Sequence, residues 1–383
     1  MIHDFKYHLP VEVHFKKGIL KEILEYTNRL DMSTILILTN EEVSKKKWFE
    51  EMREKLCKYS IRVDVCPNVV CEPTDQSINA IAELFMDCSY DGIIGIGGGS
   101  CLDSAKAVNI LLSAKANNIE DYLVPNSTLA EKKIPMILIP TTAGTGAEIT
   151  RGTVLYNEQH KIKRGFSNGG CFADIALIDP LVAKTLKKEQ IAASGVDALS
   201  HALESYLVND KHEICRLFSI SALKLITMNL EKLYQNNQNE EAAENMFLAG
   251  LLATMSFATG VGLTFSHHIS DVLGPTYKIP HGFASVFTLV ETIKQLRSKD
   301  KQIDEKMKNL EIAIGNSCIE QTLIEMFGNL QIPHFTEYAS SINQIELDSL
   351  YNKINSSDYR GVALENKELK LVLRKCLQKE KVQ

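Results

Sequence analysis

The sequence lacks the features that mark membrane, nucleic-acid-binding and secreted proteins. No apolar run approaches the roughly 18 residues that cross a bilayer, and the N-terminal MIHDFKYHLPVEVHF has no signal-peptide core. Basic residues are not in excess, because 42 Lys and Arg oppose 48 Asp and Glu for a net charge of −6. The nine cysteines include no CxxC pair, which is typical of free thiols in a reducing compartment. We therefore expect a soluble, cytoplasmic protein that binds neither membranes nor nucleic acid.

The chain has 383 residues, 45% of them apolar, which is enough for two domains with real cores. In the first half, β-branched runs alternate with helical patterns, at residues 34–39, 61–65, 135–140 and 174–179. This rhythm predicts βαβ units and a parallel sheet. After Pro180, apolar residues recur at three- and four-residue spacing, which predicts helices. We expect an α/β domain with a Rossmann-like parallel sheet over residues 1–182 and an all-α domain over residues 183–383.

Two glycine-rich turns follow predicted strands. In IIGIGGGSCLDSAKAV, a strand leads through a turn into a helix, whose first backbone N–H groups can bind a pyrophosphate. The pattern G-x-G-x-x-S is not the full Rossmann fingerprint, so a purely structural turn is the alternative. The second turn, TTAGTGAE, would line the same crevice of a parallel sheet, which favours a dinucleotide site. The candidate residues are Gly97, Gly98, Gly99, Ser100, Thr141, Thr142 and Thr145, although the threonines would look the same if they only capped a helix.

A second set of candidates lies in the predicted helical half. In GVDALSHALE, Asp197 and His201 are four residues apart and share one helical face. His267 and His268 begin a further apolar helical stretch, and His281 follows a proline in a predicted loop. One carboxylate with two or three imidazoles suits a divalent cation such as Fe²⁺ or Zn²⁺. The Asp197–His201 pair alone would more simply be a surface hydrogen bond.

Four segments resemble the iron-containing (group III) alcohol dehydrogenase family: GGGSCLDSAK, PTTAGTGAEIT, GVDALSHALESY, and the stretch from His267 to PHG. They occur in matching order over about residues 10–300. The resemblance implies a dehydroquinate synthase-like architecture and hydride transfer between the C4 atom of NAD(P) and a small alcohol or aldehyde. It assigns the metal ligands to Asp197, His201, His267 and His281. His268 is then a neighbour, since adjacent helical residues point about 100° apart.

Three positions depart from the commonest family pattern. Asp271, one turn after His267, stands where many members have a histidine near the nicotinamide, which puts that position's proton-relay role in doubt. Glu72 replaces an asparagine, and Asn40 replaces an aspartate that favours NAD over NADP. Lys45, Lys46 and Lys47 either approach a 2′-phosphate or form a solvated helix face. The cofactor preference stays open between NAD and NADP, leaning to NAD.

The resemblance also implies roles for two further residues. Lys163, in QHKIKRG, matches a lysine that family members place near the cofactor, and its alternative is a charged turn residue. Asp103, in the first glycine segment, joins the expected cofactor contacts, while Asp271 and Lys163 are the catalytic candidates. A homodimer or higher homo-oligomer is expected.

Alternative functions within the superfamily are a reductase of an acidic aldehyde, either a semialdehyde or a phosphono-aldehyde, and a polyol dehydrogenase. A metal-dependent hydrolase would use the same four ligands to activate water. The two glycine turns argue against a hydrolase, since hydrolysis needs no dinucleotide.

Overall fold

The computed structural model describes residues 4–123, 133–159, 162–167, 169–208, 212–258, 263, 265–339, 342–355, 364 and 366–377. The chain forms two compact units. One contains His8–Leu186, and the other contains Lys187–Gln383 together with the N-terminal segment that ends at Tyr7.

The first unit is built on a six-stranded sheet in which every neighbouring pair is parallel, with the order β1-β8-β5-β4-β2-β3. The strands are β1 (Glu12–Phe15), β2 (Thr34–Leu38), β3 (Arg62–Cys66), β4 (Gly92–Gly97), β5 (Met136–Pro140) and β8 (Ile175–Ile178). The central strands β4 and β5 are buried along their whole length, which explains their continuous apolar sequences. The predicted parallel sheet is confirmed.

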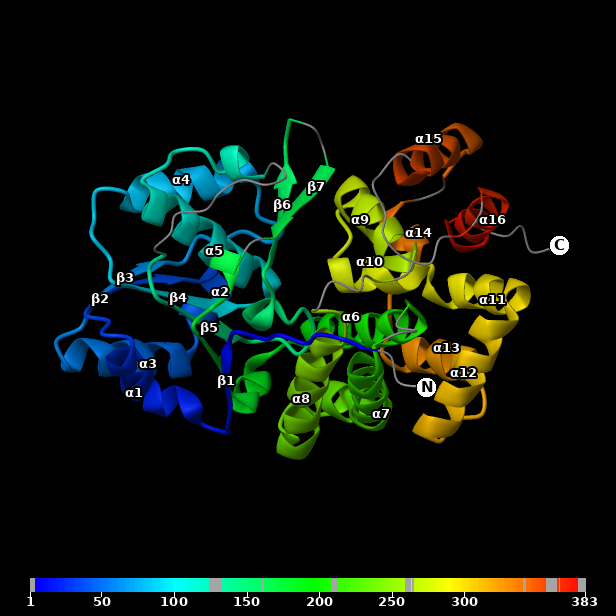
Figure 1. Cartoon of the computed structure of the whole chain (residues 1–383), viewed down its shortest axis with the longest axis horizontal. Coiled ribbons are helices and arrows are strands. Elements are labelled where there is room, and N and C mark those ends of the chain that lie inside the picture. The colour runs from blue at the N-terminus through cyan, green and yellow to red at the C-terminus, as the bar shows by residue number, and fades with distance from the viewer. Residues whose placement is uncertain are drawn as a thin grey trace. The chain divides into compact units, whose positions relative to one another are not determined.

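Helices cover both faces of this sheet, with α1 and α3 on one side and α4 and α5 on the other (Figure 1). They are α1 (Ile23–Arg29), α2 (Glu41–Ser44), α3 (Lys47–Lys58), α4 (Asp75–Phe85) and α5 (Gly99–Ala114). Helix α5 packs closely on β4, where a Cβ atom added at Gly95 would lie 2.6 Å from the Ala105 Cβ. Strand order reverses between β2 and β4, so the sheet has its switch point where the first glycine turn begins.

Two further strands form an antiparallel hairpin, β6 (Gly152–Asn157) and β7 (Ile162–Ser167), which was not predicted. Its apolar alternation is interrupted by charged residues at 163 and 164. Short 3₁₀ helices complete the unit: η1 (Ile19–Glu22), η2 (Ile119–Tyr122), η3 (Ala147–Ile149), η4 (Gly169–Cys171) and η5 (Pro180–Thr185).

The described part of the chain beyond Leu186 contains helices and no strands, as predicted. They are α6 (Lys188–Val208), α7 (Glu213–Gln235), α8 (Glu240–Phe257), α9 (Phe265–Tyr277), α10 (His281–Phe287), α11 (Leu289–Lys299), α12 (Lys301–Ile314), α13 (Ile319–Asn329), α14 (Phe335–Tyr338), α15 (Gln344–Asn355) and α16 (Asn366–Leu377). Helix α6 packs against α7, α8 and α10 and is buried almost throughout. Among the described residues, no helix is both long and apolar enough to span a membrane.

Candidate functional site

Helix α6 presents a row of buried ionisable side chains. Asp197, His201 and Glu204 follow one another at intervals of four and three residues and therefore share one face. All three are buried, with 2%, 6% and 0% of their surface exposed. The helix is held close to α7 at Gly195, where an added Cβ would lie 2.2 Å from Leu230. Buried polar side chains on a packed helix need partners, and these come from α9 and α10.

Three imidazoles surround the Asp197 carboxylate. Its Oδ1 atom lies 3.7 Å from His267 Nε2, 3.7 Å from His281 Nε2 and 4.0 Å from His201 Nε2. Asp197, His267 and His281 each contribute one ligand atom to a group whose members lie within 4.8 Å of one another. The His201 and His267 rings stack with centroids 4.5 Å apart. The structure thus brings together all four residues that the family resemblance assigned to the metal.

The polar atoms of this cluster fit a cation. Asp197 Oδ1 and His267 Nε2 are buried and have no hydrogen-bond partner in the part of the chain that the structure describes. Buried polar atoms without partners are uncommon, and they are expected where an ion supplies the missing interaction. One carboxylate oxygen and three imidazole nitrogens are a donor set that suits Fe²⁺ or Zn²⁺.

The charges of the cluster shift the pKa values of Asp197 and His267. Burial raises the pKa of Asp197, but the three histidines lower it by a larger amount, so the pKa lies well below its usual range. Burial lowers the pKa of His267, whereas the Glu204 and Asp197 carboxylates raise it, with a net increase to about 10. The raised pKa of His267 means that a cation binding to this ring would release its proton.

Glu204 is the residue of this site that the sequence analysis missed. Its Oε1 atom lies 2.9 Å from His267 Nδ1, and its Oε2 atom accepts from the His267 backbone N–H at 3.3 Å. The available signal was its position seven residues after Asp197, which puts both side chains on the same helical face.

Three further sequence predictions for this unit concern His268, Asp271 and the start of α10. His268 turns away from it and hydrogen-bonds through Nε2 to the Ile354 carbonyl oxygen at 2.9 Å. Asp271 is exposed on α9, one turn beyond His267. His281 was expected in a loop, but it is the first residue of α10, directly after the N-cap residue Pro280.

In the first unit, the two glycine turns lie side by side. The Thr141 N–H donates to the Gly97 carbonyl oxygen at 2.9 Å, which joins the ends of β4 and β5. A Cβ at Gly99 would lie 2.9 Å from Thr145, so the turns approach too closely for a side chain there. At Gly98 the nearest atom, Thr142 Oγ1, would be 3.5 Å away. Gly98 precedes α5 without a side-chain cap, so the first N–H groups of that helix are available to a ligand.

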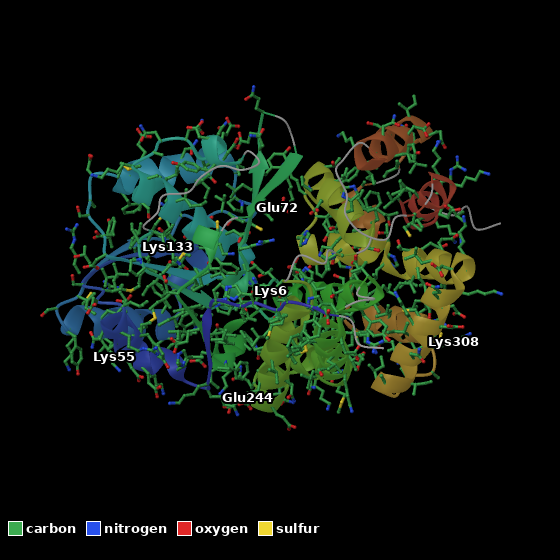
Figure 2. All side chains as sticks on the ribbon, in the orientation of Figure 1. Lys6, Lys55, Glu72, Lys133, Glu244 and Lys308 are labelled. Carbon is green, nitrogen blue, oxygen red and sulfur yellow. The ribbon has the colours of Figure 1, made fainter. Side chains whose placement is uncertain are left out.

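Ser100 and Lys163 are connected through Glu72. The Glu72 N–H donates to Ser100 Oγ at 3.2 Å, and its carboxylate accepts from Lys163 Nζ at 2.9 Å. Figure 2 labels Glu72, which lies near the β6–β7 hairpin that contains Lys163. Lys163 is thus a strand residue with an acidic partner, beside the glycine turn.

Two predicted cofactor contacts have clear structural partners. Asn40 accepts the Val43 N–H at 2.8 Å and caps α2. Asp103 pairs with Lys106 at 3.3 Å and accepts the Val154 N–H at 3.0 Å, which ties α5 to β6.

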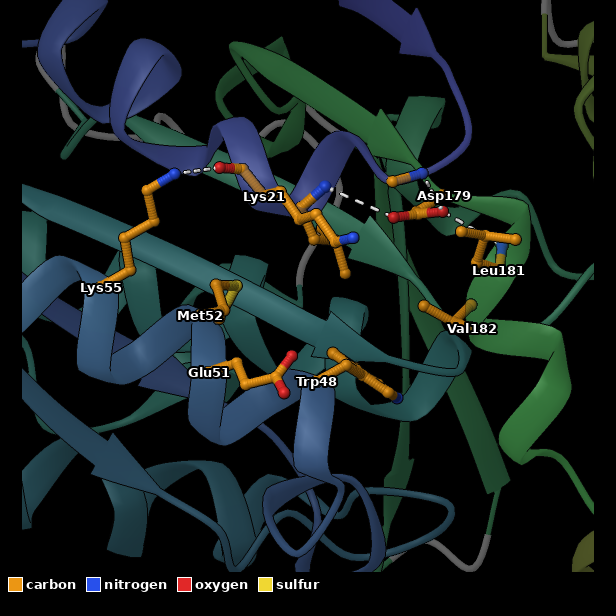
Figure 3. Close-up of a pocket in the computed structure, with 10 residues that line it drawn as sticks. Lys21, Trp48, Glu51, Met52, Lys55, Asp179, Leu181 and Val182 are labelled. Carbon is orange, nitrogen blue, oxygen red and sulfur yellow. Dashed lines mark hydrogen bonds between the residues drawn. The ribbon is translucent and has the colours of Figure 1, made fainter.

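A pocket of about 410 Å³ lies elsewhere on the first unit (Figure 3). Its walls are mainly apolar and include Trp48, Met52 and Val182. The Asp179 carboxylate at its edge already accepts the N–H groups of Gly18 and Leu181 at 2.9 and 3.1 Å. None of the predicted site residues lines this pocket.

Comparison with known protein families gives two adjoining matches. The model described as "Iron-containing alcohol dehydrogenase" matches residues 10–180. The model described as "Fe-containing alcohol dehydrogenase family, C-terminal" matches residues 191–334. Both describe dehydrogenases, so the hydrolase alternative gains no support.

Individual relatives agree with these matches. An NAD-dependent methanol dehydrogenase of Bacillus methanolicus is 31% identical over 70% of this chain and 70% of its own length. A sulfoacetaldehyde reductase of Bilophila wadsworthia is 34% identical over 70% of this chain and 69% of its own length. The crystal structure of an iron-containing alcohol dehydrogenase from Thermotoga maritima superposes with a TM-score of 0.84 at 28% identity, covering 98% of this chain and 99% of that one.

Proposed function

Given that the chain belongs to the iron-containing alcohol dehydrogenase family, and is thus an oxidoreductase acting on CH–OH groups, we propose that it interconverts a small alcohol and its aldehyde with NAD(P) and a divalent metal. The observation that carries this proposal is the cluster of one carboxylate and three imidazoles, in which Asp197, His201 and His267 are buried and His281 is partly exposed. Its two buried atoms without hydrogen-bond partners in the described chain support a bound cation.

Asp197, His201, His267 and His281 would hold Fe²⁺ or Zn²⁺, which would supply Lewis-acid polarisation of the aldehyde oxygen or stabilisation of the alkoxide. The negative charge of Asp197 offsets part of the cation's charge in a buried site. Zn²⁺ binds nitrogen-rich sites more tightly than Fe²⁺, so Fe²⁺ occupies such a site only where its supply outweighs this difference in affinity.

The glycine turns would bind the dinucleotide. Backbone N–H groups at the start of α5, from Gly99 onward, are suited to the pyrophosphate, because the first N–H groups of a helix have no intrahelical acceptor. The Thr142 hydroxyl lies beside Gly98 and can donate to the same group. Lys163 would add positive charge, reduced by its pairing with Glu72.

NAD is the preferred form in this proposal. Three lysines that could bind the 2′-phosphate of NADP are each paired with a glutamate: Lys45 with Glu41 at 2.5 Å, Lys46 with Glu42 at 3.2 Å and Lys47 with Glu51 at 3.6 Å. These glutamates offset the positive charge that would attract a 2′-phosphate. The Bacillus methanolicus relative is named as NAD-dependent, which agrees with this preference.

Asp271 is proposed as the group that exchanges a proton with the alcohol oxygen. It is exposed on α9, and it follows His267 by one turn, so it lies on the metal-binding face of that helix. A carboxylate can act as a general base when it lies within hydrogen-bond reach of the substrate.

The proposed activity is tested by oxidation of NADH or NADPH with short neutral aldehydes, using protein loaded with Fe²⁺ or Zn²⁺. We expect metal-dependent turnover with at least one aldehyde, faster with NADH, and its loss in His201→Ala. No turnover by the metal-loaded protein with any aldehyde of the panel would contradict the proposal.

A second candidate substrate class is an acidic aldehyde, and it is favoured by the likeness to a sulfoacetaldehyde reductase. Including succinic semialdehyde and sulfoacetaldehyde in the same panel separates the two classes. A higher kcat/KM for these than for neutral aldehydes of equal length would select the acidic class. The expected cytoplasmic location and homo-oligomeric state stay predictions.

A further inference from the structure

Glu204 is a fully buried carboxylate next to the proposed metal site. None of its surface is exposed, and it lies on the same face of α6 as Asp197 and His201. Burying a charge is costly unless strong hydrogen bonds compensate it. Both of its oxygens are directed at one residue of another helix, His267. This arrangement suggests a specific task for the carboxylate beyond packing.

The first contact determines which nitrogen of His267 is available. A carboxylate only accepts hydrogen bonds, so the 2.9 Å contact between Glu204 Oε1 and His267 Nδ1 requires a proton on Nδ1. The lone pair that a cation needs must then come from Nε2. Nε2 is the atom that lies 3.7 Å from Asp197 Oδ1.

The second contact fixes the backbone that carries this ring. His267 is the third residue of α9, and its N–H is among those that lack an acceptor within the helix. Glu204 Oε2 accepts this N–H at 3.3 Å, and a negative charge is also favourable at a helix N-terminus. The ring and the start of the helix are therefore held by one side chain, 63 residues away in the sequence.

We propose that Glu204 is a positioning residue that holds His267 with its Nε2 atom facing Asp197, and so prearranges the metal site. The inference rests on the metal site of the proposed function. Outer-shell carboxylates of this kind fix the tautomer and orientation of a ligand histidine, and their loss typically weakens metal binding about 10- to 100-fold.

The chain offers a matched control for a purely structural role. Glu311 is also a buried carboxylate, with 7% of its surface exposed. Its Oε1 atom accepts from the Arg297 guanidinium at 2.8 Å and from the Ile319 N–H, at the start of α13, at 3.2 Å. It therefore joins a side-chain donor to a helix start as Glu204 does, and within the described residues it forms no hydrogen bond or ion pair with the metal cluster.

The test compares the full-length wild type with Glu204→Gln, Glu204→Ala and Glu311→Gln after removal of metal with a chelator. Zn²⁺ affinity is measured by competition with a chromophoric chelator, and the coordination by the visible absorption of the Co²⁺-loaded protein. Circular dichroism and thermal unfolding report the fold. Glu204→Gln keeps the size of the side chain, so it answers the question if Glu204→Ala does not fold.

We expect Glu204→Ala to weaken Zn²⁺ binding about 10- to 100-fold and to change the Co²⁺ spectrum. Glu204→Gln should have a smaller effect in the same direction, since its amide oxygen can accept from Nδ1 while its NH₂ group opposes the His267 N–H. Glu311→Gln should lower the unfolding temperature and leave both metal readouts unchanged.

Wild-type Zn²⁺ affinity and an unchanged Co²⁺ spectrum in both Glu204 variants would overturn the positioning role. If His201→Ala still loses the metal in that case, the proposed metal site stands. If the wild type itself binds neither Zn²⁺ nor Co²⁺, the metal site fails, and the positioning role fails with it.

Discussion

Gly282 lies where α10 packs against Ala193 of α6, directly after the proposed ligand His281. A Cβ atom at this position would be 2.0 Å from the Ala193 carbonyl oxygen, whereas ordinary contacts of a Cβ atom begin at 3.4 Å. Gly282→Ala must therefore move the two helices apart by up to about 1.4 Å, the difference between these two distances. The atom in the way belongs to the backbone, so no side-chain rotation can relieve the contact.

The displacement has two consequences that can be measured. Overpacking of this kind costs about 1–3 kcal/mol of the free energy of unfolding. It also shifts His281 relative to Asp197 by much more than the roughly 0.2 Å tolerance of a metal–ligand distance. We expect Zn²⁺ affinity to fall at least about tenfold, by analogy with the effect of a lost supporting contact.

The assay measures urea unfolding of the metal-free protein and Zn²⁺ affinity by chelator competition. Gly328→Ala is the control, since a Cβ at this glycine of α13 would meet no atom within 4 Å. It should raise the free energy of unfolding by about 0.5–1 kcal/mol and leave Zn²⁺ affinity unchanged. A Gly282→Ala variant with the stability and Zn²⁺ affinity of the wild type would refute the close contact of α10 with α6.

Three more predictions concern cofactor binding, proton transfer and stability. Gly98→Val should weaken NADH binding, because a Cβ at position 98 would lie 3.5 Å from Thr142 Oγ1 and the branched side chain would extend into the turn. NADH fluorescence measures the affinity. Unchanged affinity in a folded variant would show that the turn is not part of the cofactor site. Asp271→Asn should lower turnover and alter the pH–rate profile between about pH 5 and 10 if Asp271 relays a proton. Equal profiles for wild type, Asp271→Asn and Asp271→His would exclude the relay. Burial raises the pKa of Glu148 from 4.5 to about 7, so the folded protein keeps a proton that the unfolded chain releases. The free energy of unfolding should then fall by about 3 kcal/mol from this group as the pH rises from 4.5 to 7, and Glu148→Gln should remove that decline in urea unfolding. Parallel pH dependences for wild type and Glu148→Gln would contradict the raised pKa.

The sheet and its glycine turns could be predicted because their sequence signals are local. Strands buried on both faces are continuous apolar runs, and β4 and β5 have this pattern. The role of Asn40 as the N-cap residue of α2 was not predicted, because this position was considered only as a cofactor contact, although asparagine is a favoured N-cap residue.

The features that the sequence did not predict depend on contacts between distant segments. The partner of Asp103 is Val154 in the β6–β7 hairpin, and no local pattern identified that hairpin. Glu204 contacts a histidine 63 residues away, so its spacing on α6 indicated only the face on which it lies. Position 282 likewise requires a glycine because the Ala193 backbone of α6 lies against it. The residues next to Gly282 in the sequence do not reveal this contact.

The central claim, that one buried site binds a catalytic divalent metal, is tested most directly by metal content. Wild type and His201→Ala would be reconstituted with Fe²⁺ or Zn²⁺, freed of loosely bound ions, and analysed by plasma mass spectrometry. We expect about one ion per wild-type chain and its loss in His201→Ala, since one of four ligands is deleted. Equal metal content in the two proteins, or none in the wild type, would contradict it.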